Sequence, residues 1–350
     1  MRSPAAVRDF AEPRGHPTVS QERRGSFSLA EIQGPCVALG KWINYIQVIL
    51  KEGHLDTEII ARRQLTWAQI ADWGSLIKIR QTALLLVTAI SAYTLTCGLP
   101  FDPYEGVGMT IGLFLAISGC TVLNMLLDRD VDAQMARTAD RPLAAGRIPP
   151  RAAGVLGGAL SWAGLLLSFA LDRHFGVIVA LGFGFDLWVY TMWLKRRTPL
   201  SILFGGVSGG MPVLAGRVLA LGRVDIVGIL LAMSVLLWIP SHILTLAIRY
   251  ADEYRQAGIP VWPNVYGPRA THLVIAGANL LNTLVLMTAG VQLRIHPIAL
   301  MLLSLMSGGM VILAVWQLIA PTERRNWLLF KLASLYMLAS SLTLTLGSIA

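Results

Sequence analysis

The sequence predicts an all-α, polytopic membrane protein with nine transmembrane helices. Of its 350 residues, 55% are apolar and only 14% are charged, and the mean hydropathy is +0.60. Soluble domains contain about half apolar and a quarter charged residues, so this composition argues against a soluble enzyme. From residue 78 onward, apolar runs long enough to cross a bilayer follow one another, and basic residues gather in alternate loops.

The first 70 residues differ from the rest of the chain. They are largely polar and mixed in charge, and no uninterrupted apolar run leads to a small-residue cleavage site, so they do not form a signal peptide. We expect residues 1–70 to form a cytoplasmic leader that is partly disordered. Residues 71–350 are predicted to form the transmembrane domain.

Each predicted span is an apolar run of about 20 residues, which is the length that a helix needs to cross the bilayer. The two longest loops, near residues 128–151 and 248–270, follow the second and sixth spans and hint at a duplicated four-helix bundle with a ninth helix added. The nine spans are predicted at residues 81–98, 107–127, 152–171, 174–193, 200–220, 225–247, 271–291, 297–319 and 327–348.

The loop charges orient these spans. Fifteen lysines and arginines lie on the side that includes Lys78 and the two longest loops, and four arginines lie on the other side. By the positive-inside rule we expect a multi-pass protein of the cell membrane with a cytoplasmic N-terminus. The formal net charge of +9 is then explained by the lipid bilayer, and no nucleic-acid partner is expected.

The three cysteines carry no chemical pattern. Cys36, Cys97 and Cys120 are widely spaced, without metal-ligand spacing or a disulfide framework. We interpret them as small packing residues.

The chemistry is concentrated where the second span ends. Asn124, Asp128 and Asp132 are spaced four residues apart, so on a helix each is turned by only about 40° from the last and all three share one face. Like charges one turn apart are destabilising, which suggests a cation between them. Oxygen ligands without His or Cys favour Mg²⁺, with Asp128 and Asp132 as its ligands.

Two arginines follow this motif. Arg137 and Arg141 lie within the next turns, and guanidinium groups suit phosphate oxygens. Carboxylates, metal, arginines and a diphosphate substrate therefore form one consistent site. The alternative is a solvated loop whose acids and bases pair with one another.

The segment resembles the first aspartate-rich motif of the UbiA superfamily of intramembrane prenyltransferases, in which Asn, Asp and Asp are separated by three residues each. The residues that follow resemble the protoheme IX farnesyltransferase family, the heme O synthases. The matching positions in this stretch are Met135, Arg137, Thr138, Arg141, Pro142, Leu143 and Gly146.

Two further blocks are similar to the same family. The first block matches at Tyr190, Thr191, Leu194, Lys195, Arg196, Thr198, Pro199, Gly205, Gly206, Pro212 and Gly216. The second block resembles the family's Trp-Thr-Pro-Pro-His segment, and it contains Trp238, Pro240 and His242. The resemblance runs from about residue 70 to residue 350.

This resemblance implies a UbiA-like bundle that transfers a farnesyl group from farnesyl diphosphate to a vinyl group of heme B. Mg²⁺, Arg137, Arg141 and Lys195 would stabilise the diphosphate, with Arg196 beside them. The prenyl tail would lie in an apolar tunnel between the helices. The resemblance also implies a heme A synthase or a terminal oxidase assembly as partner.

The resemblance gives three further residues a role, each with a structural alternative. Tyr190 would face the allylic cation through its ring, or would be an interfacial aromatic. His242 would ligate heme iron, or would be a hydrogen-bonding residue at a helix end. Arg80, like Lys78, would meet the heme propionates or the lipid headgroups.

The sequence departs from the family pattern in places. Ser241 replaces the second proline before His242, and Ile79 replaces the proline between Lys78 and Arg80. The second aspartate pair of the wider superfamily falls at Tyr250 and Tyr254, so that Asp252 and Glu253 are the nearby carboxylates that would bind substrate or a second metal.

Two alternative functions follow from these departures and from the fold class. The first is a UbiA-type prenyltransferase that acts on an aromatic or glyceryl-phosphate acceptor. The second is a transporter or membrane assembly factor. Transporters place ionisable residues near the bilayer midplane, whereas here the charges gather at one interface and the spans carry few of them, chiefly Asp186.

Overall fold

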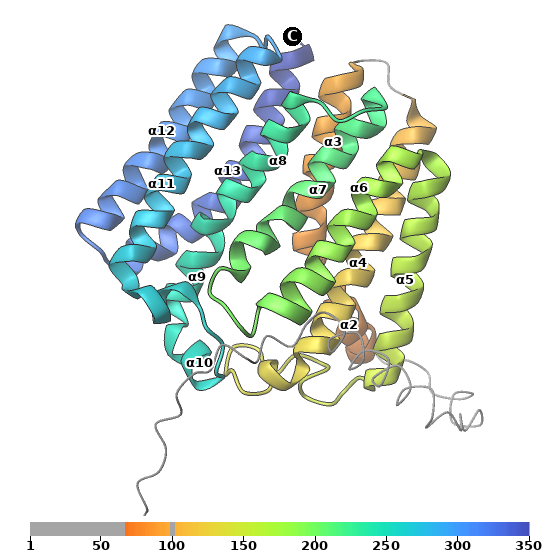
Figure 1. The fold of residues 1–350 in the computed structure, drawn as a ribbon, viewed down its shortest axis with the longest axis vertical. Coiled ribbons are helices and arrows are strands. Elements are labelled where there is room, and N and C mark those ends of the chain that lie inside the picture. Colours follow the sequence, from red (N-terminus) through yellow and green to blue (C-terminus); the bar gives the residue numbers. More distant parts are fainter. Residues whose placement is uncertain (1–66, 99–101, 350) are drawn as a thin grey trace, which may run out of the picture. The chain divides into compact units, whose positions relative to one another are not determined.

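The computed structural model describes residues 67–98 and 102–349, and all regular secondary structure in these ranges is helical. Figure 1 shows the long helices lying side by side. The elements are α2 (Trp67–Leu76), α3 (Ile79–Cys97), α4 (Pro103–Asp132), α5 (Pro150–Leu171), α6 (Arg173–Gly184), η1 (Phe185–Leu194), α7 (Ser201–Leu221), α8 (Ile226–Ile239), η2 (Pro240–Leu244), α9 (Thr245–Arg249), α10 (Ala251–Gln256), α11 (Trp262–Gln292), α12 (Pro297–Ile319) and α13 (Glu323–Ile349).

These helices confirm the predicted all-α membrane fold. Among the described residues, eight helical segments are long and apolar enough to cross a membrane, and the bent pair α2 and α3, which turns by 45°, makes a ninth. Each predicted span corresponds to one of them, with α6 continuing into η1 and α8 continuing through η2 into α9. The predicted leader lies outside the described residues, except for its last four residues, which begin α2.

Capping residues fix several helix starts at the end of the bundle that carries the α7–α8 turn. The side chains of Asp102, Asp172 and Asp225 accept hydrogen bonds from backbone N–H groups in the first turns of α4, α6 and α8. Asp225 is also paired with Arg217 of α7, at 2.6 Å. A carboxylate at a helix N-terminus satisfies free N–H groups and complements the helix dipole.

Small residues let the helices approach closely. A Cβ atom added to Gly216 of α7 would lie 2.2 Å from the carbonyl oxygen of Ala89 in α3, and one added to Gly164 of α5 would lie 2.3 Å from the backbone nitrogen of Ala116 in α4. Membrane helices lack a hydrophobic drive to associate, so close backbone packing at small residues is a main source of their stability. Gly216 and Gly164 therefore set the spacing of these helix pairs.

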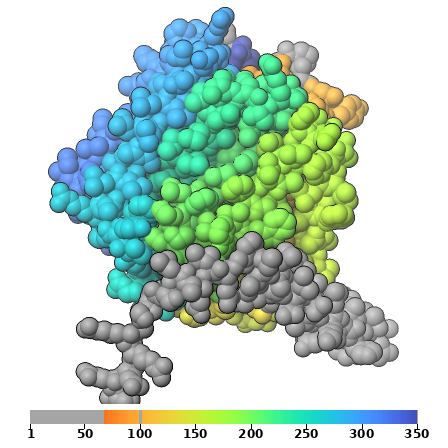
Figure 2. Space-filling view, in the orientation of Figure 1, coloured from red at the N-terminus to blue at the C-terminus, as the bar shows by residue number. Residues whose placement is uncertain are grey.

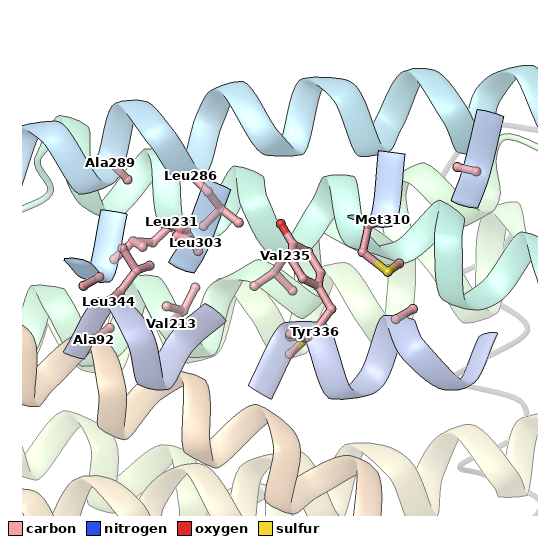
Figure 3. Close-up of a cluster of buried hydrophobic side chains, with 14 of the residues drawn as sticks. Ala92, Val213, Leu231, Val235, Leu286, Ala289, Leu303, Met310, Tyr336 and Leu344 are labelled. Atoms are coloured by element: carbon pink, nitrogen blue, oxygen red, sulfur yellow. The ribbon is translucent and has the colours of Figure 1, made fainter. Parts of the chain in front are cut away.

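The largest buried apolar cluster joins α3, α7, α8, α11, α12 and α13. Figure 3 shows part of it, with Tyr336 and Leu344 from α13 turned toward Leu231 and Val235 from α8. On the outside, Figure 2 shows a continuous surface from α5 across α7 and α8 to α11 and α12. Large apolar side chains of α12, such as Leu305 and Ile312, are exposed, as expected for helix surfaces that face lipid.

Candidate active site

The predicted Asn-Asp-Asp motif lies on consecutive turns of one helix, because α4 continues to Asp132. Asn124, Asp128 and Asp132 are 9%, 7% and 6% exposed, so a solvated loop does not describe them. We call the end of the bundle at which they lie the basic end, since Lys78, Arg141 and Lys195 also lie there. Buried charges of this kind need partners.

Two residues of η1 form hydrogen bonds with the Asn124 side chain. Its Nδ2 group donates to a carboxylate oxygen of Asp186, and its Oδ1 atom accepts a hydrogen bond from the hydroxyl of Thr191 at 2.9 Å. Cys120 and Ser208 donate to the same Asp186 carboxylate, each at 3.2 Å. The orientation of the Asn124 amide is therefore determined by η1.

The two aspartates of the motif each face a cation. Lys195 donates to Asp128, and Arg141 donates from one nitrogen to both oxygens of Asp132, at 2.9 and 2.7 Å. Acids and bases do pair, as the structural alternative expected, but the Asp128 and Asp132 carboxylates are buried. One oxygen of Asp128, Oδ1, is buried and has no hydrogen-bond partner.

The charge of Lys195 is stabilised by this pairing. Burial opposes the charged ammonium, but the Asp128 carboxylate beside it outweighs that effect, so the pKa of Lys195 is raised above its ordinary value. The lysine is a fixed cation at any physiological pH. It lies in the turn between η1 and α7, directly after the last residue of the span.

Arg137 joins the loop after α4 to α10. Its guanidinium lies over the ring of Tyr250, 5.2 Å from the centroid, and one nitrogen lies 3.4 Å from the hydroxyl of Tyr254. Its backbone N–H donates to the Glu253 carboxylate at 3.0 Å. The two tyrosines that occupy the positions of the second aspartate pair thus hold the Arg137 guanidinium.

Two predicted substrate-binding residues form their ion pairs with residues outside the motif. Asp252 is exposed and is paired with Arg255 on the same short helix, at 3.1 Å. Arg196 forms a two-pronged pair with the exposed Asp130, at 2.7 Å for each contact, and donates to the carbonyl of Leu127. The interactions of Arg196 join the end of α4 to the η1–α7 turn.

A cavity of about 900 Å³ lies between α3, α4, α6, η1, α7, α8, η2 and α13. Its wall is mainly apolar, with Asp186, Tyr190, Arg80 and His242 among its polar residues. Asp186 connects it to the motif through Asn124. A mainly apolar pocket of this size with a few placed polar groups is typical of a small-molecule site.

Tyr190 and Asp186 line this cavity from η1, where the helix widens. The N–H of Lys195 bonds to the carbonyl of Tyr190, five residues back, at 2.8 Å. Such π-helical turns are frequent at functional sites. A Cβ atom at Gly205 would lie 3.0 Å from the Tyr190 ring, so this glycine makes room for the tyrosine.

His242 lies in the second such segment, η2, and lines the same cavity. Its ring is stacked between those of Trp238 and Phe330, with centroids 4.8 and 4.6 Å away. Its Nδ1 atom lies 3.3 Å from the hydroxyl of Ser334. Both faces of the imidazole are covered, so only its edge can meet a ligand.

Asp186 and Lys78 were not assigned to the motif from the sequence. Asp186 carried a signal, since it is an acid inside an apolar span. Lys78 lies between α2 and α3 with a positive φ of 48°, a conformation that a non-glycine residue rarely adopts. Its side chain is close enough to Asp128, Arg141 and Lys195 for their charges to act on it, so Lys78 belongs to the basic end.

Buried acid–base pairs beside a mainly apolar cavity in a membrane bundle suit a ligand with an anionic head and an apolar tail. Residues 85–338, most of the chain, match the UbiA prenyltransferase family, and the chain belongs to this family. It is a multi-pass membrane prenyltransferase. This assignment decides against a transporter.

Curated relatives share much of the chain. The protoheme IX farnesyltransferase of Korarchaeum cryptofilum is 41% identical over 234 residues, which are 67% of this chain and 79% of the relative. The protoheme IX farnesyltransferase of Hyperthermus butylicus is 40% identical over 71% of this chain and 83% of its own length.

Solved structures share the fold. A digeranylgeranylglyceryl phosphate synthase superposes with a TM-score of 0.68 at 18% identity, covering 80% of this chain and 98% of its own. A UbiA homologue from Archaeoglobus fulgidus bound to GPP and Mg²⁺ gives a TM-score of 0.59 at 14% identity, covering 78% and 99% of the two chains. At these identities the likeness supports the fold alone.

Proposed function

We propose that this prenyltransferase transfers the farnesyl group of farnesyl diphosphate to a vinyl group of heme B and so forms heme O. The observation that carries the proposal is that one cavity has a wall that includes both Asp186, which is bonded to the motif, and His242. A prenyl donor and a flat, iron-containing acceptor would meet there. The identity of about 40% to curated protoheme IX farnesyltransferases supports the choice of substrates.

The diphosphate would bind at the basic end. Arg137 makes no ion pair with a carboxylate side chain among the described residues, so its charge is available to phosphate oxygens. Lys195 and Arg141 would turn part of their hydrogen bonding from the aspartates to the phosphates. Their positive charge would stabilise the negative charge that develops on the leaving oxygen.

The residues of the motif fit a Mg²⁺ ion. The orphaned Oδ1 of Asp128 is a buried anionic oxygen, and Asp132 lies one turn away. Within the described ranges no three His, Cys, Asp or Glu side chains gather as a ligand set, so water and phosphate oxygens would complete the shell. The bound ion would supply charge neutralisation for the leaving diphosphate.

The cavity would hold the reacting groups away from water. Tyr190 lines it one helical turn from Asp186 and would present its ring to the allylic cation. The edge of His242, which Ser334 and the two stacked rings orient, would ligate the iron of heme B. Arg80 would pair with a heme propionate at the cavity wall.

The placement in the cell completes the proposal. The basic end would face the cytoplasm, with residues 1–70 as a leader on that side and residues 71–350 as the catalytic domain of a plasma-membrane protein. The product would then be available to a heme A synthase or to a terminal oxidase assembly.

The experiment that tests the proposal is a direct one. Purified full-length protein, incubated with Mg²⁺, farnesyl diphosphate and heme B, should yield a heme whose mass has increased by one farnesyl group and one hydroxyl group. A protein that leaves heme unchanged but prenylates an aromatic acid or a glyceryl phosphate would instead support the alternative acceptor class.

A further inference from the structure

A second, much smaller cavity adjoins the first and has a different lining. It has a volume of about 30 Å³ and lies between α3, α7, α8, α11 and α13. Val235, Trp238 and Met337 line both cavities, so the small one lies directly behind the wall of the large one. Figure 3 shows Val235, Leu286 and Tyr336, which line the small cavity, turned toward one another.

The small cavity is polar for a site inside a membrane bundle. Besides apolar residues, its lining has one amide, from Asn282, and the hydroxyls of Thr88, Ser91, Ser234, Tyr336, Ser340 and Ser341. None of the lining residues carries a charge, so the cavity suits a neutral ligand. Its volume admits one or two water molecules and is too small for a prenyl chain.

Asn282 points to such a ligand. The residue is 2% exposed, and its Oδ1 atom is buried without a hydrogen-bond partner. An unsatisfied buried amide oxygen is destabilising, and no bulk water reaches it inside a bilayer. A water molecule in the cavity would satisfy it.

The surrounding hydroxyls can hold that water. Ser234 donates to the carbonyl of Leu231, while Ser340 and Ser341 both donate to that of Met337. Their protons are therefore engaged, and their oxygens remain free to accept. A water molecule that donates to Asn282 and to one serine, and accepts from the Asn282 amide nitrogen, makes the two to four hydrogen bonds that buried waters require.

We propose that this cavity stores the water that completes the reaction on the acceptor, an inference that rests on the proposed function. When the terminal vinyl carbon bonds to farnesyl C1, the C1–O bond breaks, diphosphate leaves, and a cation remains on the vinyl carbon next to the porphyrin. The water oxygen bonds to that carbon. The proton that it loses is taken up by diphosphate, a base that the reaction itself releases.

If no water molecule is available, the same cation reacts in another way. It loses a proton from the neighbouring carbon to diphosphate, which gives an alkene whose mass is lower by one water. The ratio of the two prenylated hemes therefore reports the water supply, whereas their sum reports prenyl transfer.

The test changes the cavity and measures that ratio. Asn282→Leu removes the amide and fills the space, and it should raise the ratio of anhydrous to hydrated product by about tenfold, because a lost hydrogen bond of ordinary strength changes a rate by about that factor. Ser340→Val should act in the same direction and serves as the second variant if the first does not fold. Asn282→Ser, which keeps a polar group and leaves space, should retain the hydrated product.

A residue of α13 outside the cavity provides the control variant. Thr343→Val removes a hydroxyl on α13 that bonds to Ala339 and does not line the cavity, so its product ratio should equal that of the wild type. An unchanged ratio in both Asn282→Leu and Ser340→Val would overturn the proposal. Diphosphate release is measured in parallel, because it reports how much prenyl transfer each variant still carries out.

A measurement independent of turnover tests the site itself. An experimental structure of the full chain that shows ordered solvent should have a water within hydrogen-bond distance of Asn282 Oδ1, and a dry cavity would overturn the proposal. Wild-type protein that makes no prenylated heme of either mass would instead refute the proposed function, and with it the role of this water. The two failures are therefore distinguishable.

Discussion

Asp128 is the residue of the motif with both a fixed partner and a free oxygen. Asp128→Asn keeps the size of the side chain but removes the charge that faces Lys195 and the proposed ligand of Mg²⁺. We expect turnover to fall by about 10²-fold or more, since a positioned charge in a dry site contributes that much to a rate. Activity assays on the purified variant, and on wild-type protein treated with EDTA, check this expectation.

A matched control lies two residues further along α4. Asp130 is exposed and paired with Arg196, so Asp130→Asn removes an equal charge from the same helix without touching the motif. Its turnover should stay near that of the wild type. Equal losses in the two variants would show that the general charge of this helix end is being measured rather than a site.

Arg137 provides the second prediction at the residue scale. Two tyrosines hold its guanidinium, and no carboxylate of the described residues pairs with it. Arg137→Met should weaken farnesyl diphosphate binding by about 2 kcal/mol, or roughly 30-fold, because one charge-assisted contact is lost. Titration with farnesyl diphosphate measures the change, and the same titration of Arg324→Met, a variant at an exposed position in the first turn of α13, should give the wild-type affinity.

A variant at His242 tests whether heme B is the acceptor that binds in the large cavity. His242→Ala removes the ring between Trp238 and Phe330 and should weaken heme B binding by about tenfold or more, while farnesyl diphosphate binding stays near that of the wild type. A spectral titration with heme measures the first and a separate titration the second. His174→Ala, at an exposed position, is the control. Unchanged heme affinity in His242→Ala would remove this residue from the acceptor site.

At the residue scale, spacing along one helix was predictable and contacts between helices were not. The alignment of Asn124, Asp128 and Asp132 follows from the period of the helix. The pairing of Asp128 with Lys195, and of Asn124 with Asp186, joins residues more than 60 positions apart. Such contacts depend on how η1 lies against α4, which no local pattern contains.

At the element scale, α7 and α8 are joined by a buried ion pair. Arg217 is 7% exposed and bonds to both oxygens of Asp225, and it also donates to Thr96 of α3. Hydrogen bonding to Arg217 lowers the pKa of Asp225 below its ordinary value. The pair therefore stabilises the fold above the unfolded-state pKa of about 3.9, and this stability is lost as the pH falls through the lower folded-state value.

Asp225→Asn isolates this contribution. The amide oxygen can still cap α8 at Gly228, so the loss comes mainly from the buried Arg217 left without its counter-charge. We expect a loss of about 1–3 kcal/mol at pH 7, which shrinks below about pH 4 as the wild-type carboxyl protonates. Thermal unfolding in detergent across this pH range measures it. Asp102→Asn, at a cap without an ion pair, should cost less, and an equal cost would contradict the assignment.

Hydropathy located the spans better than it located the helices. The predicted second span, 107–127, covers the apolar part of α4, whereas the helix itself runs from Pro103 to Asp132 and carries the motif beyond the apolar run. Likewise α11 begins at Trp262, nine residues before the predicted span, with a break at Gly267. The π-helical segments η1 and η2 were not predicted, because a shift of hydrogen-bond register leaves no periodic signal in the sequence.

At the scale of the whole molecule, the chain separates its chemistry by depth. The cations Lys78, Arg141 and Lys195 lie at the basic end, the large cavity lies among the helices beyond them, and the Arg217–Asp225 pair lies in the turn region at the other end of α7. An amphipathic substrate is matched by such an arrangement. Its anionic head would remain at the interface while its tail enters the bundle.

This arrangement makes a prediction about topology. Nine spans place the two ends of the described chain on opposite sides of the membrane, and Figure 1 shows the C-terminal end away from α10. Because fifteen of nineteen loop lysines and arginines lie on the side of the basic end, that side should be cytoplasmic.

A reporter fused after Ala350 should then report the opposite compartment: a phosphatase that is active only outside the cytoplasm should be active there. The same phosphatase fused after Arg197, in the turn between η1 and α7, should be inactive, and a cytoplasmic fluorescent protein should give the reverse pattern at both sites. An active phosphatase after Arg197 would mean that the basic end faces outward and that farnesyl diphosphate would have to enter from outside the cytoplasm.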